Sequence, residues 1–319
     1  MKPAQMITTY TEEVNAVFGP YTRYLACKLR EHSPDHVMHY GGMDLNDLGE
    51  WARKHVPSKR TKSFTNDYTA YDKSCRGETL AFEICIMRLF NVPEWVTELH
   101  VELTLCVTSA LGKLGIMRTS GQWCTYLFNT WYNDAYFTLK YVFPLATPRG
   151  FSGDDMFILC VPTISPGWLS ISRYFSLVGK PVITFLPEFC GWLLTSHGII
   201  RHPYLLYAKY LFHKENGTLA NVLISYYMEF QHSLTLGDAL WDSLPYDLLP
   251  YQGQLQLLFN QARSRIPSFL IRDNKLGDAP AAKLSARYDL FRLPADFMRM
   301  DWRLLPSSIR RSLLLARGL

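Results

Sequence analysis

The chain has 319 residues, of which 48% are hydrophobic and 19% charged, and its formal net charge is +5. This length suits about two domains, or one large domain with lobes, and the composition excludes a largely disordered protein. Seven cysteines without a Cys-x-x-Cys pair favour free thiols over a disulfide framework or a zinc site.

The two ends of the chain differ in charge. Residues 262–319 contain twelve Lys/Arg and five Asp/Glu, a net charge of +7 against −2 for the rest. A basic end of this kind is expected if it faces a polyanion, and also if it is a solvated helical face. The N-terminus lacks the apolar core of a signal peptide, and the longest uncharged run is too short and polar for a membrane span, so we predict no membrane anchor.

Two helices are predicted before the first strand. Residues 15–30 can form a helix that Gly19 and Pro20 must kink or divide, and residues 43–55 can form a surface helix. A further helix is predicted later, over residues 94–110.

Residues 63–70 are predicted to form a strand, because they are rich in aromatic and β-branched side chains. In a continuing strand, Asp67 and Asp72 would point to opposite faces. The helix formers of residues 78–90 indicate instead that the strand ends near Ala70 and turns into a helix, which lets both aspartates approach one cleft. Loop capping by the two aspartates is the alternative.

A helix is predicted over residues 122–139, with Ser120 as its cap. Four polar or small residues fall at intervals of four along one of its ridges. They are Gly121, Thr125, Asn129 and Asn133. The ridge is interpreted either as a ligand site behind a flexible glycine or as a helix-packing surface.

Two adjacent carboxylates, Asp154 and Asp155, follow Gly153 at the turn of a predicted hairpin. Adjacent carboxylates repel each other and resist burial, so a divalent cation with hard oxygen ligands is their expected partner. A surface turn is the alternative, because Gly-Asp is common turn chemistry.

A helix over residues 166–178 is predicted to end at Lys180, which is then a solvated helix-end cation or a group aimed at phosphates. Two short strands, over residues 189–194 and 198–201, come next. The chain is then predicted to be helical, over residues 204–213, 218–231, 236–242 and 251–264.

Three of these patterns form an ordered set. They are Asp67-x4-Asp72, Ser120-Gly121-x3-Thr125-x3-Asn129 and Gly153-Asp154-Asp155. Their order and chemistry resemble the palm motifs of viral RNA-dependent RNA polymerases. The sequence of residues 66–72 is similar to that of the alphavirus-like supergroup of positive-strand RNA viruses. Residues 187–192 resemble the flexivirus and tymovirus branch of that supergroup. Residues 120–123, Ser-Gly-Gln-Trp, depart from the Thr-Gly-Glu start of the plant members, which leaves a fungal virus relative open.

The resemblance implies an α+β right-hand polymerase fold with an antiparallel palm sheet. Residues 1–62 would be partial fingers. Residues 63–202 would be the palm, with interleaved fingers helices at about 91–118, and residues 203–319 the helical thumb and a basic C-terminal segment.

The resemblance also implies two-metal nucleotidyl transfer from NTPs to an RNA 3′-hydroxyl. Two Mg²⁺ or Mn²⁺ ions would be held by Asp67, Asp154 and Asp155. Lys180 would be a candidate to protonate pyrophosphate.

Substrate recognition would fall to a second set of residues. Asp72 and Asn129 would recognise the ribose 2′-hydroxyl, with Ser120 and Thr125 arranging them. Gly121 would let its loop move, and Lys2, matched to the end of the basic fingers motif, would contact the triphosphate.

The expected partners are template and nascent RNA, NTPs and the remainder of a viral replicase polyprotein, in the host cytoplasm and in membrane-associated replication complexes. Because Lys2 matches the end of the fingers motif, we expect preceding fingers residues to be absent and the isolated chain to be weakly active or inactive. Two alternatives remain: a virus-derived remnant or non-catalytic RNA-binding module that keeps the fold, and a reverse transcriptase.

Overall fold

The computed structural model describes residues 10–106, 108–109, 112–113 and 116–271. They fall into two compact units. The sheet unit contains residues up to 47 and residues 55–190, and the helical unit contains residues 48–54 and residues from 191 onward. The predicted division into fingers, palm and thumb stays a prediction.

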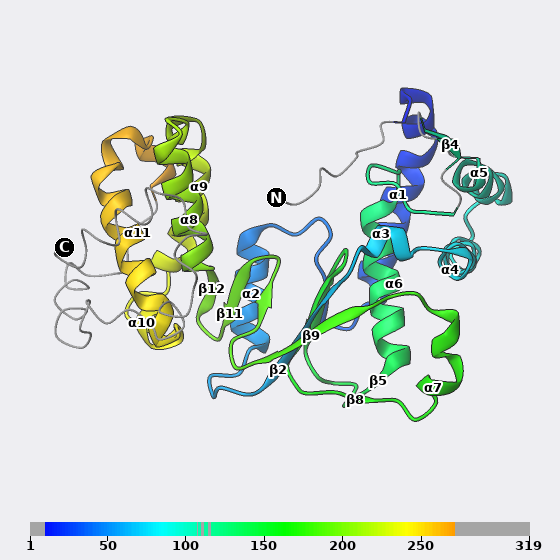
Figure 1. Cartoon of the computed structure of the whole chain (residues 1–319), viewed down its shortest axis with the longest axis horizontal. Coiled ribbons are helices and arrows are strands. Elements are labelled where there is room, and N and C mark those ends of the chain that lie inside the picture. The colour runs from blue at the N-terminus through cyan, green and yellow to red at the C-terminus, as the bar shows by residue number, and fades with distance from the viewer. Residues whose placement is uncertain (1–9, 107, 110–111, 114–115, 272–319) are drawn as a thin grey trace. The chain divides into compact units, whose positions relative to one another are not determined.

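The sheet unit combines helices with short strands (Figure 1). In chain order its elements are α1 (Glu12–His32), β1 (Val37–His39), β2 (Ser63–Tyr68), α3 (Tyr71–Ser74), α4 (Gly77–Leu89), α5 (Glu94–Leu105), β3 (Thr108–Ser109), β4 (Gly112–Lys113), α6 (Thr125–Lys140), β5 (Tyr141–Val142), β6 (Arg149–Ser152), β7 (Asp155–Ile158), β8 (Thr163–Ile164), α7 (Trp168–Ile171), β9 (Gly179–Thr184) and β10 (Glu188–Phe189). Helix α2 (Leu45–His55) follows β1 and contributes residues to both units.

The main sheet has five strands in the order β1-β6-β7-β2-β9. Neighbouring strands are antiparallel, except that β1 runs parallel to β6. Strand β2 buries Asn66 and Tyr68 while Asp67 between them is exposed, as the two-residue period of a strand requires. The predicted α+β class with a mainly antiparallel sheet is therefore confirmed.

Helix α6 packs on this sheet through an aromatic and aliphatic core. Phe137 of α6 joins Phe64, Phe151, Met156 and Ile158 in one buried cluster. The helix is buried on more than one face, because Leu127–Thr130 are buried in succession and Tyr132 and Phe137 enter different core clusters. Its buried residues include the polar side chains of Asn129, Thr130 and Asn133, and Thr130 and Asn133 bond the carboxylate-bearing hairpin.

A second cluster joins α1, α4, α5 and α6, through Phe18, Met87, Val96 and Phe128 among others.

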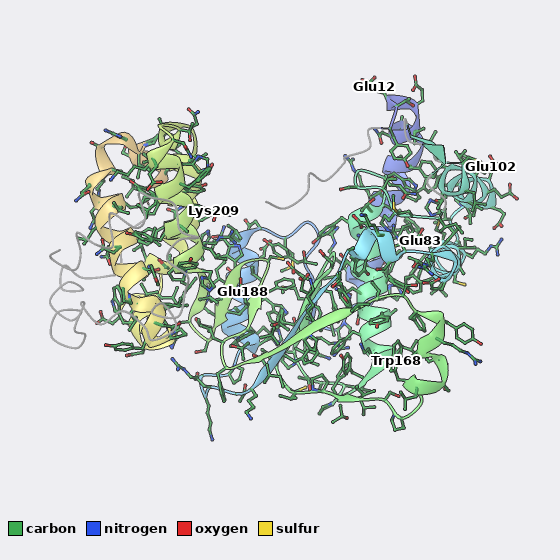
Figure 2. The ribbon with its side chains drawn as sticks, viewed as in Figure 1. Glu12, Glu83, Glu102, Trp168, Glu188 and Lys209 are labelled. Carbon is green, nitrogen blue, oxygen red and sulfur yellow. The ribbon has the colours of Figure 1, made fainter. Side chains whose placement is uncertain are left out.

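Not every carboxylate on these helices faces solvent. Figure 2 labels Glu83, which is buried on α4, and Glu102, which is exposed on α5. A buried carboxylate needs a partner, because water no longer solvates its charge.

The helical unit begins with a hairpin of β11 (Trp192–Thr195) and β12 (Gly198–Arg201), which pair antiparallel. It continues with α8 (Pro203–Glu215), α9 (Leu219–Leu234), α10 (Ala239–Ser243) and α11 (Leu249–Gln261), so the four helices predicted here are confirmed. The Phe259 ring on α11 contacts Tyr210, Tyr227 and Phe230. Within the described part of the chain, no helix combines the length and apolar character needed to cross a membrane.

The predicted helix over residues 166–178 is wrong. Only Trp168–Ile171 is α-helical, followed by a 3₁₀ turn over Ser172–Tyr174, and the segment that should end the helix is strand β9. Pro181 is tolerated in β9 because this is an edge strand, paired on one side only, with β2.

Two further helices are compared with their predictions. Helix α1 is continuous through Pro20, so it is not divided there, and buried Phe18 and Leu25 anchor it on either side of the proline. Helix α5 ends at Leu105 rather than near Ala110.

Candidate active site

The hairpin of β6 and β7 places two carboxylates at the end of the main sheet. Ser152 pairs with Asp155, which leaves Gly153 and Asp154 as the turn. Gly153 has a φ of +60°, a conformation that a side chain would strain, and it lies against the ring of Tyr126. Asp154 is consequently exposed, while Asp155 is half-buried.

The electrostatic environment of both carboxylates favours their protonated forms. Burial raises the pKa of Asp155 to about 6, repulsion by Asp154 adds to the shift, and a hydrogen bond with Cys190 opposes it. Partial desolvation raises the pKa of Asp154 as well, and repulsion by Asp67 and Asp72 adds to it. Four carboxylates therefore share one region of negative potential.

Asp67 reaches this region from the neighbouring strand. Strand β2 pairs with β7 through Asn66 and Met156, so Asp67 lies beside the Asp154 turn. On the other side of β2, Asp67 stands opposite Lys180 of β9, and the Lys180 ammonium lies 3.6 Å from the Asp67 carboxylate. The predicted position of Lys180 at a helix end is wrong; it is a cross-strand partner of Asp67.

Asp72 is brought close by the turn that follows β2. Ala70 has a φ of +50°, α3 begins at Tyr71, and the strand thus turns into a helix where the sequence predicts it. The Asp72 carboxylate accepts a hydrogen bond of 3.0 Å from the Asn129 side chain. The other polar side-chain atom of Asn129, Oδ1, is buried without a hydrogen-bond partner, so it is an unsatisfied acceptor.

Ser120 does not cap α6, contrary to the prediction. The helix begins at Thr125, because Gly121 has a φ of +101°, which no helix can continue. Thr125 instead donates its hydroxyl hydrogen to the Thr119 carbonyl at 3.0 Å and holds the loop from inside the helix. Lys2 lies outside the described residues.

Two residues of α6 support the site without a predicted role. The Gly153 amide donates to the Thr130 hydroxyl at 2.8 Å. The fully buried Asn133 amide donates to the carbonyls of Gly153 and Asp155, at 3.1 and 3.3 Å, and accepts from the Tyr68 hydroxyl at 2.9 Å. Asn133 stands on the predicted polar ridge, and that spacing is the one signal in the sequence that could have identified it.

The chemistry of the donor set suits a hard divalent cation. Asp67, Asp154 and Asp155 offer carboxylate oxygens, the ligands that Mg²⁺ and Mn²⁺ prefer. Burial and, after it, mutual repulsion raise the pKa of the hairpin pair, and a bound cation would offset both by favouring the charged forms. Among the described residues, no group of three or more His, Cys, Asp or Glu side chains is arranged so that it could already hold a metal ion.

Comparison with protein families gives one match that covers most of the chain. Residues 1–205 match the family described as RNA dependent RNA polymerase. The palm-motif resemblance of the sequence is thereby confirmed.

Curated relatives come from viruses of the predicted branch. The chain is 34% identical over 284 residues, 88% of its length, to the RNA replication protein of Botrytis virus F, and 32% identical over 315 residues, 98% of its length, to the non-structural replication polyprotein of Erysimum latent virus. It spans 15% and 17% of the length of these two relatives. It is also 31% identical over 258 residues to the RNA-directed RNA polymerase of Apple chlorotic leaf spot virus, covering 81% of this chain and 14% of that protein.

Among solved structures, an insertion loop deletion mutant of the RNA-dependent RNA polymerase of a human picorbirnavirus aligns with a TM-score of 0.47 and 11% sequence identity. The alignment covers 89% of this chain and 59% of that one.

Proposed function

Because the chain belongs to the RNA-dependent RNA polymerase family, we propose that it is the catalytic core of a positive-strand RNA virus replicase, which adds NTPs to an RNA 3′-hydroxyl on an RNA template. One observation carries the proposal beyond family membership. Two adjacent antiparallel strands, β2 and β7, bring Asp67 to Asp154 and Asp155, where the pKa of both hairpin carboxyls is raised.

Asp67 and Asp154 are proposed as the principal ligands of two Mg²⁺ or Mn²⁺ ions, with Asp155 supporting them. Two such ions, when bound, stabilise the attacking and the leaving oxygen of an in-line displacement at phosphorus. The side chains of Thr130 and Asn133 are hydrogen-bonded to the main chain of Gly153, and these bonds fix the turn that carries Asp154. Catalysis of this kind depends mainly on the positions of the metal ligands. A rigid turn under Asp154 therefore contributes more than an additional general acid or base would.

Recognition of the ribose is assigned to Asp72 and Asn129. Their carboxylate and carboxamide are already hydrogen-bonded to each other, and the buried, unpaired Oδ1 of Asn129 would accept from a 2′-hydroxyl once the side chain moves to expose it. A deoxyribose would leave that acceptor unsatisfied, which disfavours it. Ser120 and Thr125 help to arrange the pair, and Gly121 gives the loop between them its turn.

Lys180 is proposed to assist the departure of pyrophosphate. Its side chain is 57% exposed beside Asp67, so it can reach a phosphate bound there. By resemblance, Lys2 would contact the triphosphate and the basic C-terminal segment would follow the RNA backbone. The proposed partners are RNA, NTPs and the rest of the replicase polyprotein, and the proposed place is the host cytoplasm, in membrane-associated replication complexes.

The test is extension of an RNA primer on an RNA template, with Mg²⁺ or Mn²⁺, by a longer replicase protein that contains the whole chain, because the isolated chain is expected to be weakly active or inactive. Asp154→Asn should lower extension by at least about a hundredfold, because it removes a charged ligand at nearly constant shape. Glu102→Gln, which changes an exposed carboxylate of α5, is the matched control and should leave extension unchanged. Equal extension by Asp154→Asn and the unsubstituted protein would contradict the assignment.

The same assay separates the alternative functions. Binding of RNA without extension in either metal would indicate a non-catalytic RNA-binding module or a remnant. Preferential use of dNTPs would indicate a reverse transcriptase.

A further inference from the structure

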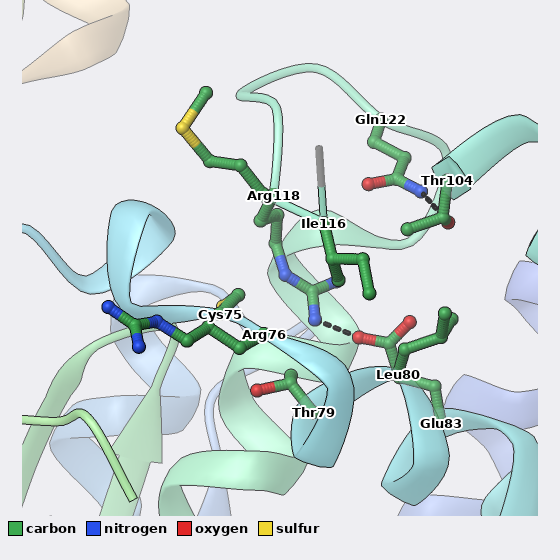
Figure 3. Close-up of a pocket in the computed structure, with 10 residues that line it drawn as sticks. Cys75, Arg76, Thr79, Leu80, Glu83, Thr104, Ile116, Arg118 and Gln122 are labelled. Atoms are coloured by element: carbon green, nitrogen blue, oxygen red, sulfur yellow. Dashed lines mark hydrogen bonds and ion pairs between the residues drawn. The ribbon is translucent and has the colours of Figure 1, made fainter. Parts of the chain in front are cut away.

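A buried network of charged and polar side chains lies outside the metal site. The Arg118 guanidinium donates to Oε1 of Glu83, and the His100 ring nitrogen Nε2 lies 2.7 Å from the other carboxylate oxygen, Oε2. All three side chains are at most 4% exposed. Figure 3 shows Arg118 and Glu83 pointing toward each other beside a small pocket that Thr104 and Gln122 also line.

Hydrogen bonding decides which ring nitrogen of His100 carries its proton. The indole nitrogen of Trp123 lies 3.1 Å from Nδ1 of His100, and an indole N–H can only donate. Nδ1 is therefore the acceptor, and the proton on Nε2 is directed at Glu83. One carboxylate thus accepts hydrogen bonds from both Arg118 and His100.

The network holds the loop of residues 118–123 at its two ends. Arg118 and Trp123 flank Ser120 and Gly121 in the chain, and both are tied, directly or through His100, to Glu83. Between these ends the loop has further contacts, because the Thr119 carbonyl accepts from the Thr125 hydroxyl and the Gln122 side chain donates to the Thr104 hydroxyl. Gly121 makes the turn of the loop with a φ of +101°. The network is therefore one of several anchors of the loop, and it acts at the two ends.

The same loop is bonded to the proposed ribose site. The Arg118 amide donates to the Asp72 carbonyl at 3.2 Å, and the Asp72 carboxylate accepts from Asn129. A displacement of Arg118 would thus be transmitted to Asp72 through the main chain.

The electrostatics of Glu83 show how tightly the pair is coupled. Burial alone would raise the pKa of Glu83, but attraction by Arg118 and the hydrogen bonds from His100 and Arg118 together outweigh burial, so the pKa lies below its ordinary value. A buried ion pair is weak evidence for stability, because desolvation offsets the attraction, whereas its fixed geometry suits a role in positioning.

We propose that Glu83 and His100 are positioning residues that anchor the loop of residues 118–123, and that this anchorage sets the discrimination between ribose and deoxyribose at Asp72 and Asn129. The inference rests on the proposed function and extends it, because it adds determinants of sugar selectivity that do not touch the nucleotide.

Two variants test the proposal in a protein that contains the whole chain. Glu83→Gln removes the charge opposite Arg118. Trp123→Phe removes the indole donor and part of the ring but keeps an aromatic ring on Phe18 and all buried charges, so it is the variant expected to fold best. Glu94→Gln is the matched control, because it breaks an exposed ion pair with Arg88 that joins the same two helices, α4 and α5.

Two quantities are measured: hydrogen exchange of the amides of residues 118–123, and the ratio of ribonucleotide to deoxyribonucleotide incorporation. Glu83→Gln and Trp123→Phe should each raise the exchange rates and lower the ratio by about tenfold, as expected when a binding group is misplaced. Glu94→Gln should change neither.

Unchanged exchange or an unchanged ratio in Trp123→Phe would overturn the proposal. If the unsubstituted protein adds no nucleotides, the proposed function fails. Hydrogen exchange still tests whether Glu83 and His100 anchor the loop: faster exchange in the two variants supports the anchorage, and equal exchange overturns it.

Discussion

The hydroxyl oxygen of Thr130 accepts a hydrogen bond of 2.8 Å from the main-chain amide of Gly153. Helix α6 therefore holds the backbone of the carboxylate-bearing turn, while the carboxylates themselves remain available for ligands. Disturbing these supporting contacts should change activity and stability together, whereas disturbing the exposed carboxylates should mainly change activity.

Replacing Thr130 by Val should lower the free energy of unfolding by about 1–3 kcal/mol, because the buried Gly153 amide loses its acceptor. Thr138→Val is the control on the same helix, since the Thr138 hydroxyl is exposed and bonds only to Asp134. Urea denaturation measures both. A Thr130→Val protein as stable as the control would show that the turn is held in another way.

Replacing Asn133 by Asp should cost about 2–4 kcal/mol, because two donated hydrogen bonds are lost and a carboxylate is placed against two carbonyl oxygens. Asn216→Asp is the chemical control, since its amide also bonds a carbonyl, that of Phe212, but at an exposed site. The difference in unfolding free energy between the two variants is the measurement. A difference below about 0.5 kcal/mol would contradict the buried role.

The contribution of Asp155 to the stability of the metal-free protein should fall as the pH rises from about 4 to about 6. Asp155 has a pKa of about 6 in the folded protein against an ordinary value of 3.8, so the folded state binds more protons than the unfolded state in this window. The free energy of unfolding then decreases with pH, by up to about 3 kcal/mol for this group.

Asp155→Asn should remove this dependence and be the more stable protein at pH 7. Denaturation at pH 4, 5 and 7 measures the difference between the two proteins. If that difference is the same at all three pH values, Asp155 does not titrate as described.

Replacing Lys180 by Ala should change the free energy of unfolding by less than about 1 kcal/mol, because its ion pair with Asp67 is more than half exposed and screened by solvent. Its effect on nucleotide addition should be larger, a loss of about tenfold or more, if Lys180 acts as a general acid. Lys73→Ala, an exposed lysine of α3, is the comparison. Equal rates for the two variants would remove Lys180 from the mechanism.

Local sequence patterns predicted the parts of the site that depend on near neighbours. Asp67, Asp72 and the Asp154 turn were identified because a strand, a tight turn and a hairpin each have a signature within about ten residues. The approach of Asp72 to Asn129 was expected only from the resemblance to viral RNA-dependent RNA polymerases, which places both residues at the ribose.

Contacts that depend on strand pairing between distant segments could not be predicted in this way. Lys180 faces Asp67 only because β9 pairs with β2 across more than a hundred residues. The residues around Lys180 in the sequence do not indicate which strand it pairs with or in which register. The bond between Glu83 and Arg118 spans 35 residues, and in the sequence each reads as an ordinary solvated charge. Helix α6 starts late because of the backbone angle of Gly121, which composition does not reveal.

Pro181 has a consequence for how copies of this protein behave at high concentration. Strand β9 is an edge of the main sheet, and its neighbours Val182 and Ile183 are largely exposed apolar side chains. An apolar edge strand with an unbroken row of unpaired amide hydrogens would favour strand pairing between two molecules. Pro181 interrupts that row and the Lys180 charge adjoins it, so the edge beside the candidate site resists aggregation.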